Sequence, residues 1–259
     1  MAARDTRKLP PPNRFNWRLM LGLVGLGALG VSTAVASYKV HLYVTADPQF
    51  SLSRERKDAL TIQGLVYASR PKVLRVFAQD FERSIFSVPL TDRRLRLIKD
   101  IDWVEDAMVS RVWPDRLVVR LIERKPVAFV SLRAGTKLID GHGVLLEQPA
   151  QSQFAFPVLS GIHDEDSDAT RRDRVRTFLQ VEEELGYLVK EISEIDASDA
   201  ENIRVVSQVE HKVVTLLMGD GNFARRYQNF VSHYPEIRKG SPEATVFDLR
   251  LDDRIAVKK

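Results

Sequence analysis

The chain has 259 residues, of which 44% are hydrophobic and 29% are charged. A chain of this length and composition buries a sizeable core, which excludes disordered and collagen-like proteins. The 39 Lys and Arg residues outnumber the 35 Asp and Glu residues and give a net charge of +4. All of that excess lies in residues 1–18, so the rest of the chain is neutral and does not indicate a nucleic-acid partner.

The segment Leu19–Tyr38 contains 20 residues and no charge. As a helix it spans roughly 30 Å, the thickness of the hydrocarbon core of a bilayer. Basic residues before it and only Lys39 close after it predict a cytoplasmic N-terminus and an exported body. The alternative is a cleavable signal peptide with Ala34–Ala36 at the cleavage site. The apolar region of a signal peptide is usually shorter, about 7–15 residues, which favours an uncleaved anchor.

The sequence contains no cysteine. Disulfides form in exported proteins, so this absence excludes a disulfide framework as well as thiol catalysis and cysteine-based metal sites. An ordinary hydrophobic core must therefore hold the exported body together.

Residues 39–126 predict a spacer followed by a small α+β module. Apolar residues at helical spacing indicate the helices, and alternating apolar residues indicate the strands. The expected elements are a polar spacer at 39–57, a strand at Ala59–Val66, a helix from Pro71 through Phe81, a helix from Thr91 or Asp92 through Ile101, and strands at Val104–Val112 and Arg116–Glu123 around a turn at Trp113–Asp115. One layer of helices then covers one face of the sheet. We expect Trp103 and Trp113 to pack in the core or against strands.

Residues 127–259 predict a second, mostly antiparallel sheet with two helices. The expected elements are short strands at Ala128–Leu132, Lys137–Ile139 and Gly143–Leu146, a helix over Asp168–Leu188 with Gly186 as its stop signal, strands at Val189–Ile195, Ile203–Val209 and Val213–Met218, a turn at Gly219–Gly221, a helix at Phe223–Tyr234 before Pro235, and a last strand at Thr245–Val257. Because no predicted element follows the last strand, Phe247–Val257 is expected to form a sheet edge to which a partner peptide adds as a further strand.

Catalytic and metal-binding motifs are missing from the sequence. It has no GxSxG elbow, no Gly-rich phosphate loop and no HExxH, and its five histidines show no ligand spacing. The acidic segment His163–Asp166 with Asp168 is compatible with a cation site, but a solvated loop is favoured. Gly219–Asn222 resembles part of a calcium loop but lacks the distal Glu, and a hairpin turn is favoured there too. We therefore expect no enzyme activity, no cofactor and no metal.

Motifs along the chain resemble the FtsQ/DivIB family of bacterial cell-division proteins. The first half is similar to the family's POTRA domain in SIFSVPL from Ser84, the pair Trp103–Val104, RVWPDRLVVR from Arg111 and ERKPVAF from Glu123. The second half is similar in LIDGHGVLL, FPVLSG, GNFARRYQNF and VFDLRLDDRIAVK. These motifs occur in the family's order behind the expected membrane segment.

The resemblance implies an α+β fold with a single N-terminal transmembrane helix, a POTRA module of β-α-α-β-β order and a second, mostly antiparallel sheet domain with two helices. The implied parts are a cytoplasmic basic tail at 1–18, a transmembrane helix at 19–38, a periplasmic spacer at 39–57, a POTRA domain at 58–126 and a C-terminal FtsQ-type domain at 127–259.

The resemblance also implies a function, that of a non-enzymatic, essential-type scaffold in the inner membrane at the division septum. Such a scaffold binds FtsB and FtsL through its C-terminal edge strand, takes no nucleic acid or small-molecule substrate, and is recruited through its POTRA sheet edge. The implied partner-binding residues are Arg226, Phe247, Asp248, Leu249, Arg250, Leu251, Ile255 and Val257. Leu251 stands where some relatives carry an aromatic residue, whereas strand addition uses backbone groups.

Two other functions stay open at this point. One is a POTRA-bearing secretion or outer-membrane assembly protein, a class that continues into a β-barrel of alternating strands. The other is a membrane-anchored periplasmic enzyme, which the absence of a catalytic motif disfavours.

Overall fold

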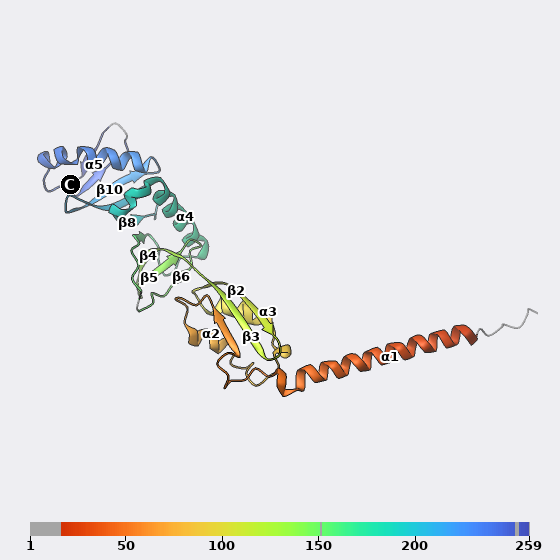
Figure 1. Ribbon diagram of the computed structural model, residues 1–259. Coiled ribbons are helices and arrows are strands. Elements are labelled where there is room, and N and C mark those ends of the chain that lie inside the picture. The colour runs from red at the N-terminus through yellow and green to blue at the C-terminus, as the bar shows by residue number, and fades with distance from the viewer. Residues whose placement is uncertain (1–16, 151, 252–253, 259) are drawn as a thin grey trace, which may run out of the picture. The chain divides into compact units, whose positions relative to one another are not determined.

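The computed structural model describes residues 17–150, 152–251 and 254–258 (Figure 1). The chain divides into two compact units. The first unit contains the N-terminal helix and the chain up to Thr61, together with Gln79–Pro89 and Ser110–Leu117. The second unit contains Ile62–Ala78, Leu90–Val109 and the chain from Val118 onward.

The N-terminal helix α1 covers Trp17–Ala46 and extends beyond the uncharged segment 19–38. Its portion Met20–Ala46 is long and apolar enough to cross a membrane. The helix continues past Lys39 because the residues up to Ala46 include no proline or glycine. It therefore has about two turns more than the span predicted from charge alone.

The segment expected to be a spacer folds as part of the first unit. A short 3₁₀ helix, η1, covers Pro48–Phe50. Phe50 and Leu52 are buried, and Ser51 forms a β-bridge with Ser84. Residues after α1 therefore pack within the first unit instead of forming a free linker.

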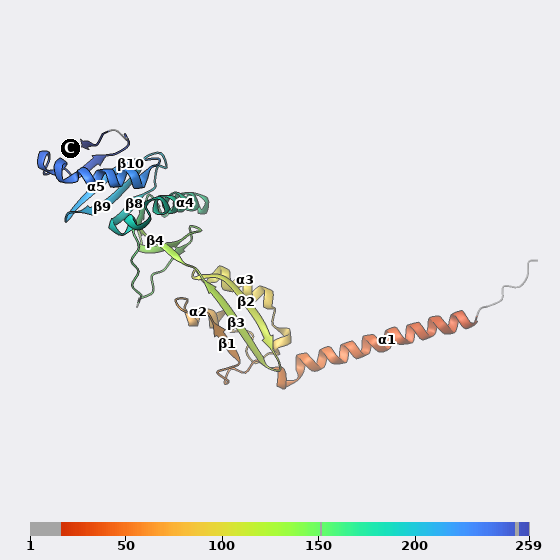
Figure 2. The ribbon, with the colours of Figure 1, turned by 45° about the horizontal axis from the view of Figure 1, so that its top comes forward.

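The small module has the predicted strand-helix-helix-strand-strand order. Its three strands form a sheet in the order β1–β3–β2 (Figure 2). Val119 and Leu121 of β3 are buried, whereas Arg120 and Ile122 between and after them are exposed, so one face of the sheet carries the core. The elements are β1 at Leu60–Gln63, α2 at Arg70–Val76, the 3₁₀ helix η2 at Ile85–Ser87, α3 at Leu90–Asp100, β2 at Val104–Val112 and β3 at Arg116–Glu123.

Both helices of the module differ from their predicted bounds. Helix α2 ends at Val76, so Phe81 lies outside it. The N–H of Phe77 bonds to the carbonyl of Leu74 at 3.1 Å, and this three-residue spacing tightens and ends the helix. Helix α3 begins directly after Pro89, so the expected cap Thr91 lies inside its first turn.

The second sheet has nine strands in the order β12-β11-β10-β9-β8-β7-β4-β5-β6. Five of its eight neighbouring pairs are antiparallel and three are parallel, which confirms the predicted α+β class. The strands are β4 at Pro126–Leu132, β5 at Gly135–Asp140, β6 at Leu145–Leu146, β7 at Val158–Ser160, β8 at Ile192–Asp196, β9 at Ile203–Val209, β10 at Lys212–Gly219, β11 at Val246–Asp248 and β12 at Ala256–Lys258.

Two helices pack on this sheet. Helix α4 covers Asp168–Leu185, with Ser167 as its cap. The predicted end at Leu188 was wrong, because the helix stops at the predicted stop signal Gly186. The predicted strand from Val189 was wrong in its start, because a 3₁₀ helix, η3, covers Gly186–Glu191 before β8. Phe178 and Val181 of α4 and Phe223 and Phe230 of α5 share one core cluster with inward-facing residues of β8, β9 and β10.

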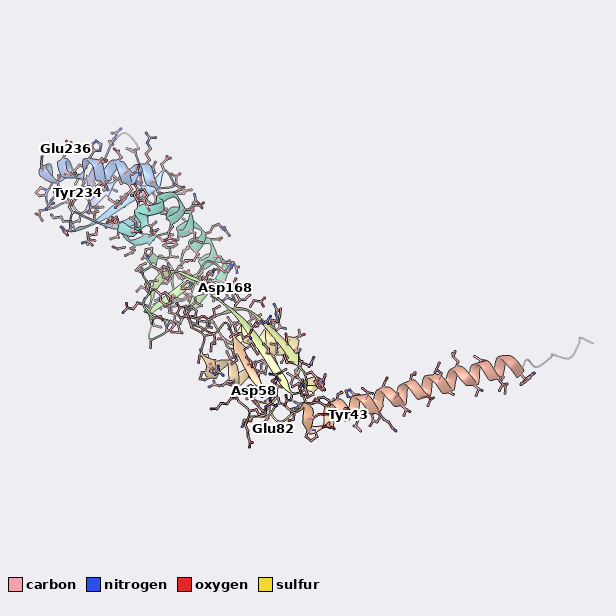
Figure 3. All side chains as sticks on the ribbon, in the orientation of Figure 1. Tyr43, Asp58, Glu82, Asp168, Tyr234 and Glu236 are labelled. Atoms are coloured by element: carbon pink, nitrogen blue, oxygen red, sulfur yellow. The ribbon has the colours of Figure 1, made fainter. Side chains whose placement is uncertain are left out.

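Helix α5 covers Phe223–Gly240 and contains Pro235, which was expected to follow the helix. Proline at this position removes one N–H bond, to the carbonyl of Val231 one turn earlier. Val231 and Pro235 are both exposed, so water reaches that carbonyl and the helix continues. The buried Tyr234 next to Pro235 keeps this part of the helix on the core (Figure 3).

The predicted last strand Thr245–Val257 was wrong, because the structure has two short strands there. β11 runs parallel to β10, and β12 returns antiparallel to β11. Asp252 and Asp253, which the prediction included, lie outside the described residues, and on either side of them the Arg254 N–H bonds to the Leu251 carbonyl. Of the two strands in this region, β12 is therefore the one at an edge of the sheet, and β6 lies at the other edge.

Candidate partner-binding site

The outer edge of β12 offers unpaired backbone groups. On either side of β11, the Leu249 N–H donates to the carbonyl of Leu217 of β10 at 2.9 Å, and the Thr245 carbonyl accepts from the Thr215 N–H at 2.7 Å. Backbone groups alternate sides along a strand, so Val246 and Asp248 point toward β12. Their register partners are Lys258 and Ala256, which leaves the N–H and C=O of Val257 pointing away from the sheet. A further strand can pair there.

A hollow of about 320 Å³ lies between α5 and the C-terminal segment. One wall consists of polar residues of α5 at helical spacing. The other wall consists of residues that follow β11 and precede β12. Leu251 is 56% exposed there and Ile255 is half-buried. The lining residues are Arg225, Arg226, Gln228, Asn229, Ser232, Leu249, Leu251 and Ile255. Apart from Arg226, the polar residues of α5 in this wall were not predicted from the sequence, where they have the spacing of an ordinary solvated helix face.

Phe247 and Leu249 are buried core residues next to the site. Phe247 is 1% exposed and packs against Phe230 at 4.9 Å and Tyr234 at 5.9 Å between ring centroids. Leu249 is also buried. Val257, the register partner of Phe247, is 38% exposed. Of the predicted apolar site residues, Leu251, Ile255 and Val257 therefore present side-chain surface.

Arg226 is half-buried at the start of α5 and makes a backbone contact. Its Nη1 donates to the carbonyl of Met218 at 2.5 Å. Gly219 next to Met218 has φ +73°, and a Cβ there would lie 2.9 Å from the same Nη1. Arg226 therefore fixes the turn from β10 into α5 while it lines the hollow.

Asp248 connects the two C-terminal strands through charge. Its carboxylate accepts from Arg250 Nη2 at 2.7 Å and lies 3.5 Å from Lys258 Nζ of β12. The bond from Arg250, with the positive charges of Arg250 and Lys258, lowers the pKa of Asp248 to about 2. The ionised carboxylate thus holds the return of the chain onto β11.

The low pKa of Asp248 predicts a pH-dependent contribution to stability. Because its folded pKa lies below the ordinary value of 3.8, its stabilisation is present above about pH 4 and disappears as the pH falls through about 2. We expect Asp248→Asn to lower the free energy of unfolding at pH 6 by about 1–2 kcal/mol, since water screens part of the pair. Urea denaturation should show this gap closing toward pH 2. Asp173→Asn, in an exposed ion pair, is the matched control with almost no effect.

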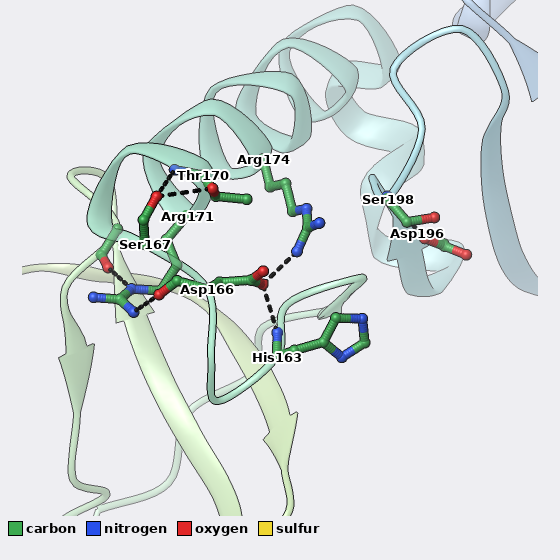
Figure 4. Close-up of polar contacts among 9 residues, drawn as sticks. His163, Asp166, Ser167, Thr170, Arg171, Arg174, Asp196 and Ser198 are labelled. Atoms are coloured by element: carbon green, nitrogen blue, oxygen red, sulfur yellow. Dashed lines mark hydrogen bonds and ion pairs between the residues drawn. The ribbon is translucent and has the colours of Figure 1, made fainter.

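The side chains of the acidic segment before α4 form hydrogen bonds and ion pairs that stabilise the fold (Figure 4). The Asp166 carboxylate accepts from the His163 N–H at 2.7 Å and pairs with Arg174 of α4. Arg171 binds Asp168 and the carbonyl of Asp166. Within the described part of the chain, His, Asp and Glu side chains form no group of three or more able to hold a metal ion.

A second surface lies on the small module within the second unit. Met108 of β2 and Ile122 of β3 are 57% and 59% exposed, although both are large and apolar. With Leu90 they line a hollow of about 880 Å³, which also contains the Arg94–Asp106 ion pair. The predicted sheet-edge contact of this module named no residues and stays a prediction. The hollow includes residues of the central strand β3, and exposed apolar side chains of this kind are a signal of a binding surface.

The fold defines a class of protein: a chain with a candidate transmembrane helix, a POTRA-type module of three strands and two helices, and a larger α+β domain in which β12 lies at one edge of the sheet that the described residues form. Family models match accordingly. The model for the FtsQ-type POTRA domain matches residues 58–124, and the model for the C-terminal part of cell division protein FtsQ/DivIB matches residues 128–250. The chain belongs to the FtsQ/DivIB family of cell-division proteins, which are scaffolds.

Two FtsQ proteins agree with the family models. The chain is 35% identical to cell division protein FtsQ of Koribacter versatilis, an alignment that covers 92% of this chain and 69% of the relative. It is 25% identical to FtsQ of Shewanella oneidensis, over 95% of this chain and 88% of the relative. A solved extracytoplasmic domain of DivIB from Geobacillus stearothermophilus is 18% identical over 47% of this chain and 96% of that domain, with a TM-score of 0.26.

Proposed function

We propose that the chain is a non-enzymatic division scaffold that captures FtsB, together with FtsL, by strand addition to β12. The observation that carries the proposal is the outward N–H and C=O of Val257 on the edge of the sheet. A partner strand paired there lies beside the hollow at α5, where Leu251 and Ile255 offer apolar contact. Family membership, which implies division proteins as partners, supports this assignment.

In this proposed function the N-terminus lies in the cytoplasm and both folded domains lie in the periplasm. The supporting observation is the charge of the sequence around α1, with five basic residues before the uncharged segment and Lys39 after it. The exposed apolar surface around Met108 and Ile122 is then available for recruitment by other division proteins. The chain thereby links early and late components of the septal assembly.

A fluorescent protein fused to the N-terminus is expected to form a band at the division site in growing cells. Depletion of the chain is expected to produce filaments, because a scaffold that joins other division proteins cannot be bypassed at that step. Time-lapse microscopy measures both results. A uniform envelope signal, or normal division after depletion, would contradict the scaffold function.

A further inference from the structure

An aromatic cluster lies at the C-terminal end of α1 in the first unit. Tyr43 lies there, as labelled in Figure 3, and its ring packs edge to face against that of Phe50 with centroids 5.6 Å apart. Phe50 also packs against Phe86 at 5.3 Å and against Trp113 at 6.5 Å. Phe50 is 3% exposed, whereas Tyr43, Phe86 and Trp113 are 54%, 39% and 68% exposed. Three exposed aromatic side chains therefore pack against one buried ring.

Hydrogen bonds fix this cluster to the helix. Ser84 Oγ donates to the carbonyl of Val44 in the last turns of α1 at 2.6 Å. Arg111, two residues before Trp113, donates its Nε to the carbonyl of Ile85 at 2.7 Å. The segment that carries Phe86 is thus joined on one side to α1 and on the other to the end of β2.

The length of α1 sets the depth of the cluster in a membrane. The uncharged segment of roughly 30 Å ends at Tyr38, and Tyr43 lies only about 6 Å beyond Lys39 along the helix axis. The headgroup layer on each side of a bilayer is about 5–8 Å thick. Since the ring of Phe50 lies 5.6 Å from that of Tyr43, the cluster begins within or beside this layer.

Trp113 was expected to pack in the core or against strands, and the structure exposes it instead. A single exposed apolar residue needs no explanation, but here three exposed rings pack on one buried ring and gather apolar surface in one place. Tryptophan and tyrosine favour the membrane–water interface, where the ring leaves water and its N–H or O–H still finds polar partners.

We propose that Tyr43, Phe86 and Trp113 form an interfacial anchor that seats the β2–β3 turn in the headgroup layer of the phospholipid bilayer. The anchor rests on the proposed crossing of the membrane by α1. It holds the start of the exported body at a fixed height above the bilayer, so that the body does not swing freely on the end of the helix.

Tryptophan fluorescence of the full chain in phospholipid vesicles tests the anchor. The chain has three tryptophans, Trp17, Trp103 and Trp113. Trp17→Phe removes the one at the start of α1, and Trp103 is 6% exposed and protected by the fold. Comparison of Trp17→Phe with the double variant that also carries Trp113→Phe isolates the emission of Trp113. Vesicles of phosphatidylethanolamine and phosphatidylglycerol are prepared with and without phosphatidylcholine brominated near the headgroup end of its acyl chains.

We expect brominated lipid to reduce the emission of Trp113 by at least about twofold. Flotation of the vesicles reports separately whether α1 inserts. A chain that floats with the vesicles but whose Trp113 emission is insensitive to brominated lipid overturns the anchor and leaves the membrane crossing intact. A chain that does not float overturns the crossing and the anchor together. Protection of Trp113 from aqueous acrylamide only after a division protein is added assigns the patch to that protein and also overturns the anchor.

Discussion

Replacing Val257 by proline is expected to weaken the capture of the FtsB–FtsL pair by at least about tenfold. Proline removes the outward N–H of Val257 and places its ring where the partner strand must pair. The partner carbonyl that would accept this bond is left buried and unpaired, which costs about 1–3 kcal/mol. Pull-down with the purified pair and titration of the binding signal measure the loss.

The fold is expected to survive this substitution, because Ala256 and Lys258 carry the bonds from β12 to β11. Proline is tolerated in edge strands where its missing N–H faces outward. Circular dichroism and the midpoint of urea unfolding should therefore match those of the unsubstituted chain within about 0.5 kcal/mol.

Val257→Ala is the matched control, since it removes the side chain and keeps the backbone groups. We expect it to bind within about threefold of the unsubstituted chain, because a side chain that is 38% exposed contributes little. If alanine and proline reduce capture equally, the side chain and not the backbone carries the contact, and strand addition is wrong. If neither reduces it, the site lies elsewhere.

Local sequence signals placed the elements whose bounds depend on neighbouring residues. The hairpin Val104–Val112 and Arg116–Glu123 was predicted with its exact bounds, since β-branched alternation is interrupted by Trp113–Asp115 at a single point. The stop signal Gly186 was recognised in the same way, although helix α4 ends at Leu185 and not at the predicted Leu188.

The elements that were mispredicted depend on distant contacts. Pro235 is a local stop signal, and the helix passes through it because Tyr234 is buried in the core and Val231 faces solvent. The strand expected over Thr245–Val257 breaks because Asp248 is held by Arg250 and by Lys258 from the returning chain. Neither the sheet partner of β11 nor this charge contact has a signature in the local sequence.

The candidate site was predictable only in outline. The position of the last strand and the family resemblance indicated strand addition near the C-terminus. Strand addition stays a proposal, which now concerns the edge strand β12. Which backbone groups face outward depends on the parallel pairing of β10 with β11, which periodicity does not reveal. The hollow beside α5 requires two segments that meet only in the fold.

Removal of the Arg124 guanidinium is expected to cost about 3 kcal/mol of the free energy of unfolding. Arg124 Nη1 binds the Asp140 carboxylate at 2.8 Å, and these side chains are 14% and 3% exposed. Arg124→Met leaves that carboxylate buried without its cation. Asp140 keeps the bonds from the N–H groups of His142 and Val144, which limits the loss. Urea denaturation of the full chain in detergent micelles measures it.

Arg176→Met is the matched control for this effect. Arg176 pairs with Asp173 on the surface of α4, where the two side chains are 77% and 69% exposed. Its loss is expected to cost less than about 0.5 kcal/mol. In the double variant Arg124→Met with Asp140→Asn the buried charge is gone, so the double variant should be more stable than Arg124→Met alone. Equal losses from the buried and the exposed arginine would contradict the role of burial.

The position of this pair makes its loss more than a local effect. Arg124 is the last residue matched by the POTRA family model, and Asp140 lies within the match to the C-terminal model. Trp103 Nε1 also donates to the Glu147 carbonyl at 2.9 Å, and its ring packs against Phe154. Because these contacts join the two matched regions, Arg124→Met should separate one unfolding transition into two. A single transition at lower urea would show that the remaining aromatic contacts suffice to keep the two regions cooperative.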